Sequence, residues 1–307
     1  MIEVESLSKS FAGKPAVTEI SFQASDREIF VLLGPSGCGK TTTLKMINRL
    51  IEPDSGTIFI DGKNIRDQKV EQLRKGIGFV MQHAGLFPHY TIRQNIAVVP
   101  TLLKWDKKLI GKRTAELLEK LHLPADTLDR FPHQLSGGQQ QRVGIARALI
   151  ADTPVLLMDE PFGALDNITK TGIHAEFKSL EELKNKTILL VTHDVQEAFE
   201  LGHRICLMDK GKIIQTGTPT DMLYRPENAF VADFFAGDRL LLEHKTATLK
   251  AIEPYLQNSA IKGRLNEFKQ NSSIWEVLQK LSDRIHENQV YDDLIKSFNE
   301  YRKTQVR

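Results

Sequence analysis

The run Gly34-Pro35-Ser36-Gly37-Cys38-Gly39-Lys40-Thr41 constrains the fold of this chain more than any other feature. It fits the pattern G-x-x-x-x-G-K-[ST], follows the apolar run Ile29–Leu33 and precedes a helical segment. Its glycines let backbone N–H groups wrap a phosphate without Cβ clashes, and the helix N-terminus adds partial positive charge. Lys40 can reach the β- and γ-phosphates, and the Thr41 hydroxyl can bind Mg²⁺. This order predicts a nucleotide-phosphate loop instead of a glycine-rich turn that binds nothing.

Short apolar runs recur after the phosphate loop with helical segments between them, which predicts a parallel α/β sheet covered on both faces. The runs are Val155–Met158, Ile188–Val191 and Ile205–Met208, and Gly211–Gly217 is expected to add a turn and a final strand. The first 25 residues alternate weakly between apolar and polar, and they are expected to form antiparallel strands.

Two other parts of the chain carry helical patterns without strand signals. Residues from about 93 to 150 show them at Lys112–Leu123 and Gln139–Ile150, which predicts a helical insertion into the α/β domain. After about residue 238 the chain is expected to form a mostly helical tail. Ser273 and Glu276 resemble a capping box there, and apolar residues follow at helical spacing. We therefore expect a domain at 1–237 and an extension at 238–307.

Composition excludes several classes of protein. Apolar residues make up 41% and charged residues 26% of 307 positions, as in globular proteins. With 41 Lys and Arg against 39 Asp and Glu, the net charge of +2 gives no overall attraction to nucleic acid. Two cysteines cannot make a disulfide framework, and a reducing compartment is expected. No signal peptide or membrane span is expected, so a membrane role would need another subunit to span the bilayer.

Two adjacent carboxylates follow the buried run Val155–Met158. Asp159 is expected to hold Mg²⁺ through water, and Glu160 is expected to polarise an attacking water. Alone, such a pair is equally well read as solvated acids at a strand end. Beside a phosphate loop, it predicts phosphoryl-transfer chemistry.

The run Leu135-Ser136-Gly137-Gly138-Gln139 opens a helix and forms a second anion-binding turn. One nucleotide can use two such sites only if they lie close together. This run resembles the signature motif of the ATP-binding-cassette (ABC) ATPases, and the resemblance covers about residues 1–237. It implies a P-loop NTPase fold and a head-to-tail dimer, formed with a second copy or a close paralogue, in which each signature closes over ATP on the other subunit.

The resemblance also implies roles for individual residues. Ser136 and Gly138, with Gly137 and Gln139, would bind the partner's γ-phosphate, and Thr42 would add to the phosphate loop. Gln82 would sense Mg²⁺ and water, Glu160 would be the catalytic base, and His193 would contact the γ-phosphate. Asp166 would cross the dimer interface. Phe11 would stack on adenine, with core packing as its alternative.

Further resemblances point to an importer. Gly85–Pro88 is similar to the segment that contacts the permease, and Glu160–Asp166 also resembles importers. Lys40–Leu50 and Asn95–Trp105 are similar to ATPase subunits that power uptake of glycine betaine, choline, carnitine or related amines. The resemblance implies integral-membrane permease subunits, an extracytoplasmic substrate-binding protein as an indirect partner, and a peripheral location on the cytoplasmic side of the cell membrane.

Alternatives and departures remain. An importer of amino acids, polyamines or anions fits the same motifs, because an ATPase subunit never touches the solute. A soluble ABC ATPase acting on DNA or ribosomes is disfavoured, since the chain has one cassette and no room for a coiled coil between Lys40 and Asp159. Members of the amine-importer group often end in two regulatory modules. The tail 238–307 is too short for both, so it is either one degenerate module or a helical extension. Asn167 replaces a usual proline.

Overall fold

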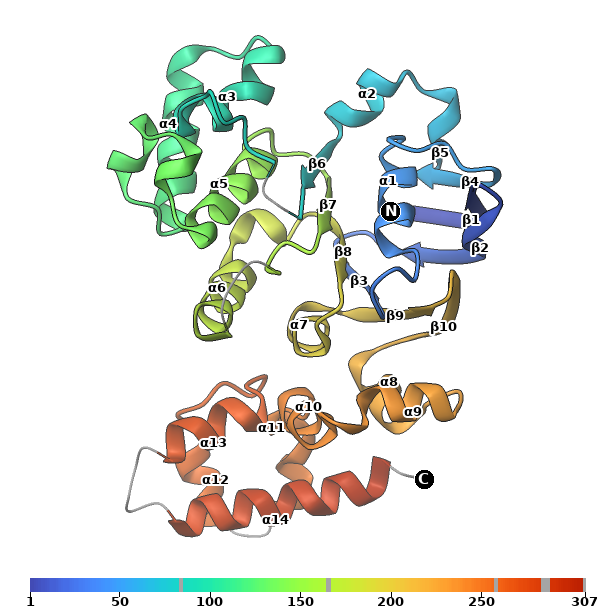
Figure 1. The fold of residues 1–307 in the computed structure, drawn as a ribbon. Helices are drawn as coiled ribbons and strands as arrows, with labels where there is room; N and C mark the ends of the chain where they lie inside the picture. The colour runs from blue at the N-terminus through green and yellow to red at the C-terminus, as the bar shows by residue number, and fades with distance from the viewer. Residues whose placement is uncertain (83–84, 164–166, 257–258, 283–287, 306–307) are drawn as a thin grey trace. The chain divides into compact units, whose positions relative to one another are not determined.

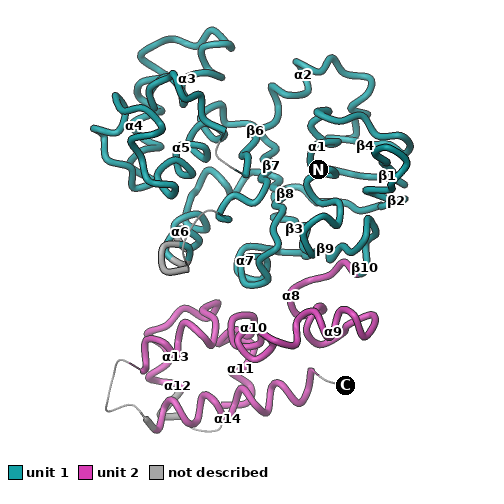
Figure 2. The backbone as a smooth tube through the Cα atoms, viewed as in Figure 1, with its two compact units in different colours: residues 1–214 teal, residues 215–307 magenta. Residues whose placement is uncertain are grey.

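The structure, a computed structural model, describes residues 1–82, 85–163, 167–256, 259–282 and 288–305. The chain forms two compact units, residues 1–214 and 215–307 (Figure 2). The predicted boundary after residue 237 stays a prediction. Within the described ranges, no helix is both long and apolar enough to cross a lipid bilayer.

A six-stranded sheet, built from strands between residues 29 and 217, lies at the centre of the first unit (Figure 1). Five neighbouring strands of this sheet pair in parallel, as predicted, and their short apolar runs are buried, which suits the middle of a parallel sheet. The sheet order is β10 (Lys212–Gly217), β9 (Arg204–Asp209), β3 (Ile29–Leu33), β8 (Thr187–Thr192), β7 (Val155–Asp159) and β6 (Ile77–Val80).

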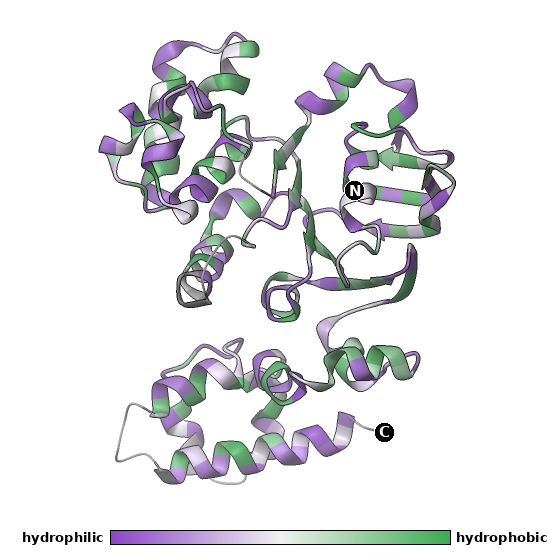
Figure 3. Cartoon of the chain, in the orientation of Figure 1, coloured by the Kyte–Doolittle hydropathy of each residue, from purple (hydrophilic) through white to green (hydrophobic). Residues whose placement is uncertain are grey.

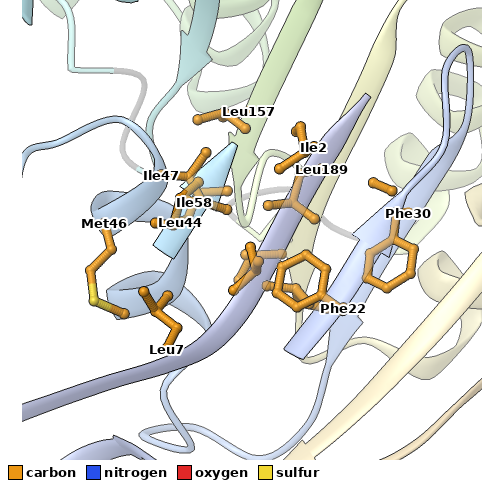
Figure 4. Packing of buried hydrophobic residues seen from close by; sticks show 14 of the residues in the cluster. Ile2, Leu7, Phe22, Phe30, Leu44, Met46, Ile47, Ile58, Leu157 and Leu189 are labelled. Carbon is orange, nitrogen blue, oxygen red and sulfur yellow. The ribbon is translucent and has the colours of Figure 1, made fainter. Parts of the chain in front are cut away.

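A four-stranded antiparallel sheet packs against the parallel sheet. Its order is β2 (Lys14–Ala24), β1 (Ile2–Phe11), β4 (Ser55–Ile60) and β5 (Lys63–Asn64). Side chains from this sheet, from the parallel sheet and from α1 (Lys40–Ile47) meet in one hydrophobic core (Figure 4). Phe22 and Phe30 stack at 5.2 Å between ring centroids and join the two sheets. Because α1 contributes Leu44, Met46 and Ile47 to this core, the phosphate loop before it has a rigid support.

The described chain between β6 and β7 contains helices and no strand, in agreement with the predicted helical insertion. Its helices are α3 (Ile92–Leu102), α4 (Lys107–Lys120) and α5 (Gly137–Leu149), with 3₁₀ turns at Ala125–Asp129 and Pro132–Gln134. The other helices of this unit are α2 (Val70–Lys75), α6 (Asn167–Ser179) and α7 (Val195–Leu201), with 3₁₀ turns at Ile65–Asp67 and Glu181–Leu183.

Residues 215–307 form a helical unit with its own core. Hydrophobic and hydrophilic residues alternate along its last two helices at helical spacing (Figure 3). Its helices are α8 (Pro219–Tyr224), α9 (Ala229–Ala236), α10 (Arg239–Thr246), α11 (Leu249–Ile252), α12 (Ser259–Leu265), α13 (Ile274–Ser282) and α14 (Asn288–Gln305), with a 3₁₀ turn at Glu253–Tyr255. The predicted capping box is present, since Ser273 Oγ accepts from the backbone N–H of Glu276 at 3.2 Å.

Candidate functional site

The carboxyl ends of four parallel strands bring most of the predicted residues to one edge of the sheet (Figure 1). The phosphate loop follows β3, Asp159 ends β7 and Glu160 comes directly after it, His193 follows β8, and Gln82 follows β6. Parallel strands place their carboxyl ends on the same side, where open α/β sheets bind ligands. Residues far apart in sequence therefore meet here.

Two glycines of the phosphate loop have no room for a side chain. A Cβ on Gly34 would lie 2.1 Å from the Met208 carbonyl oxygen, and one on Gly39 would lie 2.5 Å from that of Ala16. Gly39 also has φ +108°, a conformation that other residues rarely adopt. Gly39 precedes α1 without a side-chain cap, so the first N–H groups of the helix stay available to an anion.

Lys40 is buried, and its Nζ turns back onto the loop. It donates to the carbonyl oxygens of Gly34 at 2.7 Å and Pro35 at 2.9 Å. The Cys38 thiol lies 3.7 Å from the same nitrogen, and burial raises its pKa although Lys40 opposes the shift. Cys38 is therefore a packed small side chain of the loop.

Thr41 and Asp159 form the part of the site that fits a Mg²⁺ ion. The Thr41 hydroxyl donates to Asp159 Oδ1 at 2.8 Å, so two hard oxygen atoms lie together beside the phosphate loop. Asp159 is buried, which raises its pKa, although the hydrogen bond from Thr41 opposes the shift. Lys45 and Lys40 also oppose the shift, yet the pKa stays raised, so a further cation would stabilise the ionised carboxylate. Among the described residues, no group of three or more His, Cys, Asp or Glu side chains is arranged to hold a metal ion.

Glu160 is held by two other predicted residues. Its Oε2 accepts from Gln82 Nε2 at 3.0 Å and lies 3.1 Å from His193 Nδ1. The backbone of Glu160 has φ 44°, a strained conformation for a side-chain-bearing residue, and its N–H donates to the Val191 carbonyl at 2.9 Å. The strand end thus aims this carboxylate at Gln82 and His193.

Phe11 ends β1, and its side chain is 46% exposed, so it does not lie in the core. Lys9 Nζ lies 5.6 Å from its ring centroid. An exposed ring of this kind can stack on a planar base.

The signature residues lie apart from this group, at the start of α5 in the helical insertion. Ser136 caps the helix by accepting from Gln139 N at 3.3 Å, and Gln139 Oε1 accepts from Ser136 N at 3.1 Å. The capping box fixes the turn that contains Gly137 and Gly138. Asp166 lies outside the described residues.

The site contains polar residues to which the sequence analysis gave no role. Asp194 caps α7, and Lys170 on α6 donates to it at 2.6 Å. Glu197 in the first turn of α7 is buried and accepts from Thr192 Oγ1 at 3.1 Å. Asp194 and Glu197 are three residues apart, a spacing typical of a helix N-terminus, and this pattern could have identified them from the sequence.

Comparison with known proteins agrees with this geometry. A family model described as "ABC transporter" matches residues 17–163. The glycine betaine/carnitine/choline transport ATP-binding protein OpuCA of Bacillus subtilis is 52% identical over 78% of this chain and 64% of its own length. This chain therefore spans less than two thirds of that relative.

Two further likenesses each cover more than four fifths of the compared protein. The glycine betaine uptake system ATP-binding protein YehX of Escherichia coli is 47% identical over 84% of this chain and 83% of its own. A solved dimeric post-hydrolysis structure of the ATP-binding cassette MJ0796, bound to ADP and Pi, has a TM-score of 0.65 and 33% identity over 71% of this chain and 98% of that one. With these likenesses and the converging motifs, the chain belongs to the ABC transporter family and contains that family's ATP-binding cassette.

Proposed function

We propose that this protein is the ATP-hydrolysing subunit of an importer for an osmoprotectant such as glycine betaine, choline or carnitine. The observation that supports ATP hydrolysis best is the convergence of Lys40, Thr41, Asp159, Glu160 and His193 on one sheet edge. The solute follows from relatives that are named for glycine betaine, carnitine and choline transport.

Each residue of the site is proposed to have one role in phosphoryl transfer to water. Lys40 would release the carbonyls of Gly34 and Pro35 and turn to the β- and γ-phosphates. Glu160 would accept a proton from the attacking water, while Gln82 and His193 orient its carboxylate. Thr41, Asp159 and Gln82 would hold Mg²⁺, which supplies charge neutralisation at the phosphates. Phe11 would stack on adenine.

The signature turn is proposed to act on a second subunit. Ser136, Gly137, Gly138 and Gln139 lie on the helical insertion and take no part in the hydrogen-bonded groups around Asp159 and Glu160 that are described above. MJ0796 was solved as a dimer bound to ADP and Pi. In a head-to-tail dimer this turn would reach the γ-phosphate on the partner, where its N–H groups complete the site.

A cleft of about 180 Å³ is proposed to receive the permease. Phe79 lines it, together with the cations Arg74, Lys75 and Arg147. Arg147 Nη1 also donates to the Gly85 carbonyl at 2.7 Å, which joins the cleft to the segment expected to contact a permease. This lining suits an amphipathic segment with an acidic residue. Permease binding would hold the subunit on the cytoplasmic side of the membrane.

Substitution of Glu160 tests the catalytic proposal. We expect Glu160→Gln to lower ATP hydrolysis by roughly 100-fold or more, because the amide cannot accept a proton, and to leave ATP affinity within a few-fold. Glu181→Gln is the matched control, since that carboxylate pairs with Lys184 and is 80% exposed. Near-normal hydrolysis by the Glu160 variant would refute its role as base.

Affinity purification from detergent-solubilised membranes tests the transport proposal. A tagged chain should bring down a multi-span membrane protein, after which uptake of labelled betaine and choline identifies the solute. Recovery of soluble partners alone, such as ribosomes, would refute transport and leave the ATPase proposal intact.

A further inference from the structure

Helix α6 contacts both of the segments that present Glu160 and His193. Phe162, two residues after Glu160, is buried and packs edge-on against His174 at 4.8 Å and Phe177 at 5.5 Å between ring centroids. The same helix reaches α7, the helix that begins just after His193. One helix thus supports both partners of the 3.1 Å contact between Glu160 and His193.

The first contact between α6 and α7 is an ion pair at Asp194, the residue that directly follows His193. Asp194 Oδ2 accepts from Lys170 Nζ at 2.6 Å, and its Oδ1 accepts from the backbone N–H groups of Gln196 and Glu197 at 2.9 and 3.1 Å. Only 14% of the Lys170 side chain and 25% of the Asp194 side chain are exposed, so water screens the pair weakly. Lys170 therefore fixes the residue that starts α7.

A second contact lies one helical turn further along α6. His174 Nδ1 lies 2.7 Å from Glu200 Oε2, and 6% of the His174 side chain is exposed. Lys170 and His174 are four residues apart, so they share one face of α6. Two contacts at this spacing fix both the position and the rotation of α7 relative to α6.

The other neighbour of His193 is also fixed. Thr192 Oγ1 accepts from Asp194 N at 3.0 Å and donates to the buried Glu197 at 3.1 Å. Both residues that flank His193 are thus hydrogen-bonded inside the protein, while its own ring is 51% exposed. The ring can contact a ligand, and its backbone position depends on Asp194.

We propose that Lys170 is a positioning residue for His193: through Asp194 it ties the start of α7 to α6, and thereby sets the His193 ring against Glu160 and the γ-phosphate. This inference rests on the proposed ATPase function. It assigns no contact between Lys170 and nucleotide. It predicts that loss of the Lys170 charge slows hydrolysis and spares the phosphate loop.

The test compares Lys170→Met with Lys170→Arg in the full chain. Met keeps the aliphatic stem, and we expect it to lower kcat roughly two- to thirtyfold while ADP affinity stays at the wild-type value. Arg can still donate to Asp194 and should restore most of the rate. Lys184→Met is the matched control because it also removes a lysine from an ion pair in this unit, 2.6 Å from Glu181, away from the site.

The variant His193→Ala shows whether Lys170 acts by positioning His193 or by stabilising the site in another way. If Lys170 acts through His193, adding Lys170→Met to His193→Ala should cause no further loss of rate. An additive loss, an unchanged kcat in Lys170→Met, or a parallel loss of ADP binding would each overturn the inference. Failure of the wild-type chain to hydrolyse ATP would instead refute the proposed function.

Discussion

At the scale of single residues, Glu197 has an unusual environment for a carboxyl group. It is buried beside Thr192 and Asp194, one of its carboxyl oxygens has no hydrogen-bond partner, and burial raises its pKa to about 8 from an ordinary 4.5. Lys170 opposes this shift, while the negative charges of Asp194 and Glu160 add to it. A carboxyl group with this pKa keeps its proton at neutral pH and loses it in mild alkali.

The raised pKa of Glu197 predicts how stability depends on pH. The folded chain binds this proton more tightly than the unfolded chain, so the stabilisation is complete below pH 4.5 and is lost as the pH rises through about 8. Glu197→Gln, which stays neutral, should match wild type near pH 4.5 and exceed it at pH 9. The difference in unfolding free energy between Glu197→Gln and wild type should grow by at most about 1.4 kcal/mol per pH unit. Urea unfolding at several pH values measures it, and a constant difference would contradict the raised pKa.

The sequence predicts residues whose chemistry depends on local spacing, and it misses residues whose role depends on long-range contacts. Gly34 to Thr41 are consecutive and form a loop and the first residues of α1, so their sequence pattern determines their geometry. Lys170 and Asp194 are joined only because α6 and α7 pack together. No local pattern predicts that pairing, and the burial of Glu197 is likewise a property of the folded chain.

At the scale of elements, apolar runs locate most central strands correctly. The runs at 155–158, 188–191 and 205–208 became β7, β8 and β9 with one added residue at one or both ends. Strand β6 (Ile77–Val80) was missed because Gly78 interrupts a short apolar run. A Cβ there would lie 2.6 Å from the Ala148 carbonyl, so this glycine allows α5 to approach the sheet.

Helix α3 holds the segment before it through one side chain. Asn95 is fully buried, and its Oδ1 accepts from Phe87 N at 2.7 Å. Its Nδ2 donates to the carbonyls of Phe87, Tyr90 and Thr91, each at 3.1 Å. A single amide therefore shapes the loop that exposes the Phe87 and Tyr90 rings, which is the loop expected to face a permease.

Removal of this amide should disturb the loop and leave catalysis in place. We expect Asn95→Ala to cost about 1–3 kcal/mol, since it leaves backbone groups without partners, and to weaken co-purification of the permease. Asn64→Ala is the control because it removes one bond, from Arg66 N at 2.9 Å, far from α3 in sequence. Thermal unfolding and affinity purification measure both effects. Unchanged permease recovery would exclude this loop from the interface.

At the scale of the whole molecule, the two units have separate hydrophobic cores. Leu157 of β7 belongs to the core of residues 1–214, and Leu294 of α14 belongs to that of residues 215–307. Neither side chain is exposed. Helical periodicity predicted a mostly helical tail, but periodicity does not show which core a helix joins.

Substitutions that create a cavity of similar size in each core test whether the two units fold and function independently. Leu157→Ala and Leu294→Ala each delete the same buried atoms, and each should cost about 2–5 kcal/mol. Leu157 lies two residues before Asp159, so its loss should also reduce ATP hydrolysis. Leu294→Ala should lower only the unfolding transition that ATP does not shift, and should leave hydrolysis at the wild-type rate. Calorimetry with and without ATP separates the transitions. Loss of hydrolysis in Leu294→Ala, with the first unit still folded, would show that the tail controls the ATPase.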